Sequence, residues 1–210
     1  MTVRHLVRIA FSSFLALGVS GAVIGASGSD PRLPVRLSSG RVSIAGTSNI
    51  HDYTASTTNV RVVRLELADG VVFGPNVWDE MIKPGAIESF EVAIAAGSLS
   101  SPREGIDKNM YKALKVAEFP TITFRLVRFD GGSDPGRLHA TGLLTIAGVQ
   151  REVALDLKTT RHDSSFTVTG TVTLLMTDYG VTPPKAMLGM LKTDPKVTVT
   201  FETVLTIPLT

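Results

Sequence analysis

The clearest pattern along the chain is an alternation of apolar and polar residues with a period of two. Phe166, Val168 and Val172 share one face of residues 166–174, and threonines occupy the other face. Such alternation is typical of a β-strand with one buried and one solvated face, and the branched Cβ of threonine suits a pleated surface. Further runs predict strands over 41–47, 51–57, 60–67, 87–95, 121–126, 138–146, 152–158 and 197–202.

Short turns separate the later strands, at residues 130–136, 147–148 and 161–164. Consecutive strands with short links pair as antiparallel neighbours. A long antiparallel sheet tends to close on itself, because closure removes its exposed edges. The sequence therefore predicts an all-β fold, an antiparallel barrel of about eight strands.

Two short helices are expected between the strands. Ser101, Pro102 and Glu104 have the order of a capping box, with Ser101 as N-cap, so a helix should begin there. Apolar residues at every fourth position then give the helix one apolar stripe. A second, shorter helix is predicted from Thr182-Pro183 to a stop before Pro195.

The first residues differ from the rest of the chain. Arg4 and Arg8 form a positive head, and an uncharged, largely apolar stretch ending in small residues follows. This order is typical of a secretory signal peptide. We predict a leader over 1–28, a flexible tether over 29–40 rich in Ser, Gly and Pro, and one domain over 41–210. The alternative is an uncleaved membrane anchor.

Export predicts a periplasmic or secreted protein with no stable membrane span after cleavage. The chain has no cysteine, so burial and hydrogen bonding must stabilise it without disulfides. It has 21 Lys and Arg against 19 Asp and Glu, and removing Arg4 and Arg8 leaves 19 of each sign. A neutral domain has no basic surface for phosphates, so nucleic acid is not an expected partner.

Residues with catalytic or metal-binding chemistry are few. His51, His139 and His162 are far apart in the sequence, so we predict no metal and no cofactor. His51 and Asp52 are adjacent, and Asp52 could orient His51 as a base. The favoured interpretation is a turn at the start of a strand, in which Asp52 accepts hydrogen bonds from nearby backbone N–H groups.

Several motifs resemble those of the YceI family. Residues 107–114 (DKNMYKAL) and 118–124 (EFPTITF) resemble its short helix and the strand that follows. Residues 142–149 (GLLTIAGV) are similar to its second hallmark, and 46–53 (GTSNIHDY) and 178–184 (DYGVTPP) are similar to one of its subgroups. The resemblance covers roughly residues 41–206.

This resemblance implies a lipocalin-like barrel with an elongated apolar cavity and a binding protein rather than an enzyme. Members commonly lie in the periplasm or are secreted, and some hold polyisoprenoid or fatty-acid-like chains. The expected partner is therefore a lipid or isoprenoid small molecule, and a homodimer is an assembly to be tested. The residues predicted to line the cavity or close one end are Phe90, Val92, Ile94, Met110, Leu114, Phe124, Leu126, Phe166, Val168, Val172, Met187 and Leu188.

Two other functions stay open. A structural or stress-response envelope protein would have a filled barrel and no ligand. Gly142 and Gly170 on the inner face favour interior space, although glycines also permit sharp curvature. An enzyme would use His51 or His139 and would lose turnover, with its fold intact, when that histidine is replaced.

Overall fold

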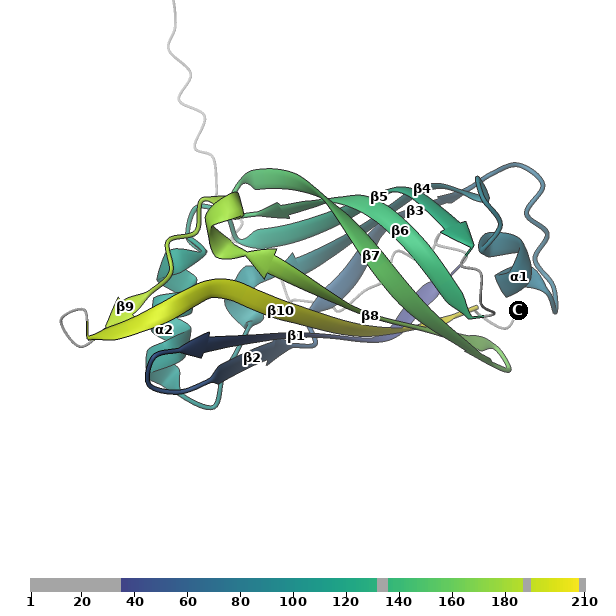
Figure 1. The fold of residues 1–210 in the computed structure, drawn as a ribbon. Coiled ribbons are helices and arrows are strands. Elements are labelled where there is room, and N and C mark those ends of the chain that lie inside the picture. Colours follow the sequence, from purple (N-terminus) through teal and green to yellow (C-terminus); the bar gives the residue numbers. More distant parts are fainter. Residues whose placement is uncertain (1–34, 132–135, 187–189, 208–210) are drawn as a thin grey trace, which may run out of the picture.

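The computed structural model describes residues 35–131, 136–186 and 190–207. The predicted leader, residues 29–34 of the predicted tether, and Met187 and Leu188 lie outside these residues. The main element is one antiparallel sheet that curls into an elongated, barrel-like shape (Figure 1). The strands are β1 (Arg36–Ser48), β2 (Tyr53–Thr57), β3 (Val60–Leu67), β4 (Ile87–Ala95), β5 (Thr121–Gly131), β6 (Arg137–Ile146), β7 (Val149–His162), β8 (Ser165–Leu175), β9 (Lys185–Ala186) and β10 (Leu191–Thr206).

The order of strands in the sheet is β2-β1-β10-β8-β7-β6-β5-β4-β3, and β9 pairs only with β10. The predicted all-β antiparallel fold is confirmed, with nine strands in the main path rather than about eight. Each predicted strand overlaps an observed one. β1 begins at Arg36, so the last five residues of the predicted tether, 36–40, belong to the sheet.

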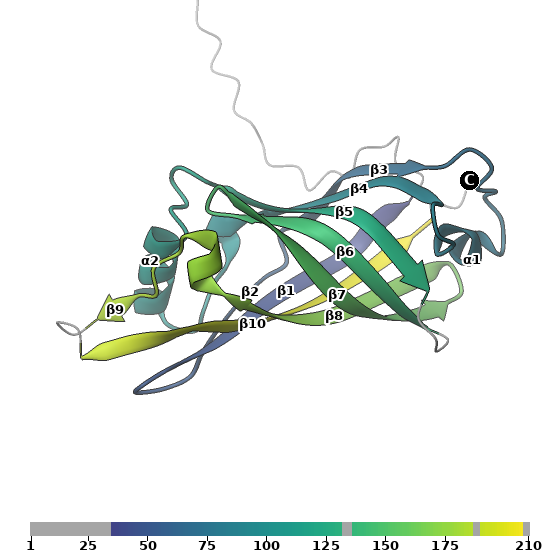
Figure 2. The ribbon, with the colours of Figure 1, turned by 45° about the horizontal axis from the view of Figure 1, so that its top comes forward.

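β3, at one end of the strand path, lies beside β1, and no hydrogen-bonded ladder joins these two strands among the described residues. β2 covers only Val42–Gly46 of β1, which leaves the first part of β1 beside β3. Gly40 allows a close approach there, since a Cβ on Gly40 would lie 3.0 Å from Cβ of Val60. Figure 2 shows the sheet curling around its long axis from β3 to β1.

The tight turn between β6 and β7 is the predicted Ala147-Gly148 pair. Ala147 has φ 48° and Gly148 has φ 79°, and Ile146 pairs with Val149 across the turn. Positive φ at both central residues is the geometry of a type I′ hairpin, whose twist matches that of the flanking strands.

Helix α1 (Val77–Met81) closes one end of the curled sheet. Its Trp78 is buried and stacks on Phe166 of β8, with ring centroids 5.1 Å apart and an interplanar angle of 13°. Arg161, at the end of β7, donates a hydrogen bond of 2.6 Å to Oδ2 of Asp79 and another to the Pro75 carbonyl. These contacts hold α1 against the β7–β8 hairpin.

Helix α2 (Glu104–Ala113) lies at the opposite end, and its N-cap is Arg103, two residues later than predicted. Ser101 is not its N-cap. The Ser101 hydroxyl instead donates to the Arg103 carbonyl and accepts from the Arg103 N–H, a local turn that competes with helix. A carboxylate oxygen of Asp107 accepts from the Ser101 N–H at 2.8 Å.

The second predicted helix is wrong in its described part. Lys185 and Ala186 form β9 and pair with Lys192 and Leu191 of β10. A 3₁₀ turn, η2 (Met176–Tyr179), comes before this segment and ends at Gly180 with φ 65°. The strand pairing satisfies backbone groups that a helix would have satisfied internally, so the tertiary contact overrides the local pattern.

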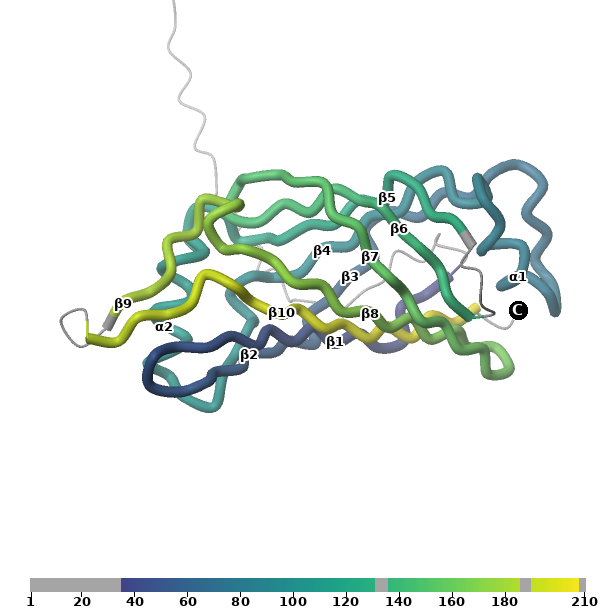
Figure 3. The backbone as a smooth tube through the Cα atoms, viewed as in Figure 1, coloured from purple at the N-terminus to yellow at the C-terminus, as the bar shows by residue number. Residues whose placement is uncertain are grey.

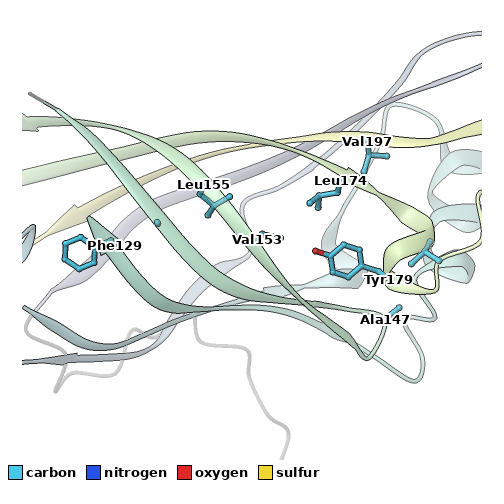
Figure 4. Close-up of a cluster of buried hydrophobic side chains, with 9 residues drawn as sticks. Phe129, Ala147, Val153, Leu155, Leu174, Tyr179 and Val197 are labelled. Atoms are coloured by element: carbon cyan, nitrogen blue, oxygen red, sulfur yellow. The ribbon is translucent and has the colours of Figure 1, made fainter. Parts of the chain in front are cut away.

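The core lies on the concave face of the sheet, where alternate side chains of β5 to β10 converge (Figure 4). Aromatic rings there lie over glycines. A Cβ on Gly142 would be 2.3 Å from the Phe124 ring, and a Cβ on Gly170 would be 2.4 Å from the Phe201 ring. The two glycines therefore make room for neighbouring aromatic rings. The sequence suggested free interior space at these glycines, but the rings fill it.

Replacing Gly170 with alanine should destabilise the fold. The added methyl group would overlap the Phe201 ring, and overpacking of this kind typically costs about 1–3 kcal/mol. Gly105→Ala is the matched control, because a Cβ at that helical position meets nothing within 4 Å. The control should be neutral or stabilising by roughly 0.5–1 kcal/mol. Urea unfolding of both variants measures the difference, and equal stabilities would contradict the ring-over-glycine account.

Candidate functional site

An apolar cavity of about 260 Å³ occupies the interior of the curled sheet. Its walls are the inward side chains of the strands, which the period-two alternation places on one face. Thr203 is the single hydroxyl residue among the described residues that line it, and its hydroxyl donates to the Val168 carbonyl at 3.4 Å. Nothing in these walls therefore requires a polar ligand group.

The structure brings most of the predicted lining residues together. Phe90, Val92 and Ile94 of β4 line this cavity, and the predicted residues on β5 and β8 that line it are Phe124, Leu126, Phe166, Val168 and Val172. Met110 of α2 and Leu114, which directly follows this helix, line a second cavity. Ligand contact at these positions stays a prediction.

Helix α1 makes the floor of the apolar cavity. Trp78, Met81 and Ile82 line it from this end, and Trp78 and Met81 are buried. No helix was expected here from the sequence. The single tryptophan was a signal, but its stacking partner Phe166 lies far away in the sequence.

A second cavity, of about 360 Å³, lies at the α2 end. It shares five wall residues with the first cavity, so the two adjoin along the barrel axis. The shared residues are Ile44, Ile122, Ile146, Leu174 and Val199. Figure 3 follows the chain along this axis, from α1 at one end to α2 at the other.

The walls of the second cavity include polar side chains. His51 comes from the turn before β2 and Tyr53 from the start of β2. Arg103 and Asn109 come from the α2 segment, and Thr193 comes from β10. An antiparallel bridge between Ser56 and Ser100, with two backbone hydrogen bonds of 2.9 Å, ties β2 to the segment before α2. This bridge brings two sets of polar residues to one end of the barrel.

A turn centred on Ser48 positions His51. The Ser48 hydroxyl donates to the His51 carbonyl at 2.7 Å and accepts from the His51 N–H at 3.1 Å. The favoured interpretation of this motif named the wrong acceptor for the backbone hydrogen bonds of the turn. The Ser48 hydroxyl accepts from the His51 N–H, whereas Asp52 is exposed and makes no hydrogen bond among the described residues. Asp52 does not orient His51 through Nδ1, since that atom has no hydrogen-bond partner.

Tyr53 lies over Gly46, its antiparallel partner on β1. A Cβ on Gly46 would be 2.3 Å from the Tyr53 hydroxyl oxygen. Burial raises the pKa of the Tyr53 phenol, and the negative charge of Asp194 raises this pKa further. The phenol therefore stays protonated at neutral pH and can donate a hydrogen bond.

Two buried polar atoms in this cavity, Nδ1 of His51 and the hydroxyl oxygen of Tyr53, have no hydrogen-bond partner. Buried polar groups in folded proteins are nearly always paired, so such exceptions mark sites that need an explanation. No sequence signal identified Tyr53, because its surroundings depend on the pairing of β1 with β2.

His139, the other histidine considered as a catalytic group, and three lysines of the α2 segment lie away from both cavities. Nδ1 of His139 lies 2.6 Å from Oδ1 of Asp156, but this cross-strand pair is exposed on the outer face. Lys108, Lys112 and Lys115 are exposed, and none is among the described wall residues of either cavity. These lysines therefore form a solvated face.

No group of three or more His, Cys, Asp or Glu side chains in the described part of the chain is arranged to hold a metal ion. No described helix is long and apolar enough to cross a membrane.

The fold resembles several solved structures. BcnA of Burkholderia cenocepacia matches with a TM-score of 0.61 at 14% identity, over 79% of this chain and 95% of that one. A polyisoprenoid binding domain from Saccharophagus degradans, implicated in plant cell wall breakdown, matches with a TM-score of 0.61 at 13% identity, over 84% of this chain and 100% of that one. The YceI protein of Campylobacter jejuni matches with a TM-score of 0.51 at 14% identity, over 71% and 85% of the two chains. At these identities the likeness shows a shared fold.

Comparison with curated proteins gave no match. The profile of the YceI-like domain matches residues 76–205, from the segment before α1 to the end of β10. The match covers more than half of the chain and includes the walls of both cavities from β4 onward. The chain belongs to the YceI-like domain family.

Proposed function

We propose that this protein binds a long-chain amphiphile non-covalently, with its tail in the apolar cavity and its head toward the α2 end. The observation that carries the proposal is the wall of the inner cavity, which is almost wholly apolar along the barrel. Each buried methylene contributes about 0.8 kcal/mol, so a long tail can bind without any charged contact. Ligand sites of this class are apolar with a few placed polar groups.

The comparisons support a polyisoprenoid or a fatty-acid-like chain as the tail. The Saccharophagus degradans relative is described as a polyisoprenoid binding domain. Both kinds of chain are flexible and apolar, and the wall of Val, Ile, Leu and Phe side chains suits either one. We propose a binding role without catalysis for this chain.

We also propose that the protein works outside the cytoplasm, in the periplasm or as a secreted protein. The support is the order of charged, apolar and small residues over 1–28. Fractionation of cells that express the full chain, with N-terminal sequencing of the product, tests this location. We expect an envelope or medium fraction in which the leader has been removed, and a full-length cytoplasmic product would contradict it.

Native mass spectrometry of the protein purified from its own envelope tests the binding role. We expect a stoichiometric adduct that organic solvent extracts as a long-chain lipid. Reconstitution of the stripped protein with the extracted lipid is the control, because a specific adduct should return in a one-to-one ratio. A bare protein that also fails to take up added lipid would contradict the proposal.

A filled barrel without ligand is the second candidate, favoured by the rings that occupy the space beside Gly142 and Gly170. Leu126→Trp separates the two functions, because Leu126 lines the inner cavity. If the cavity holds a tail, the larger side chain should enter it at a small cost in stability and should reduce lipid uptake at least tenfold. In a filled barrel, the same change would overpack the core at a cost of about 1–3 kcal/mol.

Val127→Trp is the matched control on the same strand. Val127 is 51% exposed on the outer face, so this variant should keep both the stability and the lipid uptake of the parent. Thermal unfolding and lipid uptake would be measured on both variants. A severe loss of stability in Leu126→Trp alone would favour the filled barrel.

A further inference from the structure

The second cavity differs from the first in one respect that bears on ligand chemistry. Its wall places two buried polar atoms without protein partners, Nδ1 of His51 and the hydroxyl oxygen of Tyr53, next to apolar side chains of the barrel. An unpaired buried polar group is destabilising, so a fold that keeps two of them in one cavity has a use for them.

His51 lies in the turn before β2 and Tyr53 is the first residue of β2, and both residues line the second cavity. The hydrogen bonds between Ser48 and His51 fix the backbone of this turn. Packing over Gly46 fixes the Tyr53 ring. The backbone at His51 and the ring of Tyr53 are thus positioned by the protein itself.

The surroundings of Tyr53 disfavour an anion. Burial and the Asp194 carboxylate both raise the pKa of the phenol, so this position disfavours negative charge. A carboxylate or phosphate oxygen beside the phenol would meet the same desolvation and the same repulsion. Arg103, which also lines this cavity, is exposed, and its charge is solvated.

A hydroxyl group matches the two atoms. The Tyr53 O–H is a donor, and Nδ1 of a neutral histidine accepts in one of its two tautomers. A hydroxyl can accept from the first and donate to the second, which satisfies both atoms and carries no charge. It is also narrow enough to end an unbranched tail without widening the cavity.

We infer that His51 and Tyr53 form the head-group site of this cavity and select an amphiphile whose head is an uncharged hydroxyl. This inference rests on the proposed function and deepens it by naming the head group. It also orients the ligand, with the hydroxyl between β2 and α2 and the end of the tail directed toward Trp78.

Binding of three probes with the same 16-carbon chain tests the inference. The probes are 1-hexadecanol, hexadecanoate and hexadecane, delivered from cyclodextrin at pH 7 to the full-length protein stripped of lipid. We expect hexadecanol to bind roughly tenfold or more tightly than either other probe, since a net hydrogen bond and the burial of a charge each change affinity by about this factor.

Tyr53→Phe and His51→Leu should each reduce the affinity for hexadecanol roughly five- to tenfold and leave that for hexadecane unchanged. Tyr53→Phe should unfold at the same urea concentration as the parent or a higher one, because the lost hydroxyl had no partner. Tyr111→Phe is the matched control. Its hydroxyl donates to the Leu99 carbonyl at 2.6 Å outside the cavity wall, so this variant should lose stability and keep the preference for hexadecanol.

Other outcomes would overturn the inference in distinguishable ways. Equal affinity for hexadecanol and hexadecane, unaffected by Tyr53→Phe, would leave tail binding intact and remove the head-group site. Tightest binding of hexadecanoate, lost in Arg103→Gln, would make the head an anion. Failure of all three probes to bind the stable, stripped protein would overturn the proposed function itself.

Discussion

The packing of aromatic rings over glycines on the concave face of the sheet decides how the remaining side chains can be arranged. A sheet that curls this strongly brings the inner side chains of facing strands together, and large rings fit only where a neighbouring position lacks a side chain. Phe124 over Gly142 and Phe201 over Gly170 are such pairs in the middle of the sheet, and Tyr53 over Gly46 is one at its end. Each pair lets a ring lie close to the wall of the sheet, beside the cavities that these rings help to line.

The strands were predictable because their periodicity is a local property. Burial on one face imposes alternation on every strand, and positive φ imposes small residues on the turn at Ala147-Gly148. The inner-face residues of β4, β5 and β8 could be named for the same reason, since the pattern states which side chains share a face. Their contact with a ligand is a separate question that a periodicity does not address.

The errors arose where a competing contact, either within a local turn or with a distant strand, replaced the contact that the sequence pattern favours. Ser101 has the composition of an N-cap, yet its hydroxyl bonds within a turn and the helix begins at Glu104. Apolar residues after Thr182 are spaced as in a helix, but part of this segment pairs with β10 as a strand. Trp78 stacks on Phe166 and Tyr53 lies over Gly46. Nothing near either aromatic residue in the sequence identifies its partner.

The two ends of the barrel are unlike in chemistry. Stacked rings and an arginine anchor seal the α1 end, whereas histidine, tyrosine, arginine and asparagine side chains surround the cavity at the α2 end. The proposed ligand, which has one polar terminus, would therefore bind in one orientation along the barrel. Desolvation sets this orientation, because a polar group at the α1 end would lose its hydration without gaining a partner.

The meeting of β1 and β3 without a backbone ladder makes one line along the barrel mechanically softer than the rest. Elsewhere, a change in girth would have to break inter-strand hydrogen bonds, but the contact of Gly40 with Val60 consists of van der Waals packing alone. The exposed side chains of Arg61 and Arg64, with the bulge between Val62 and Arg64, keep the β3 edge from pairing with another chain. A small parting of β1 and β3 would therefore widen the barrel without breaking a ladder of the described sheet, and the proposed ligand site could in this way admit tails of different thickness.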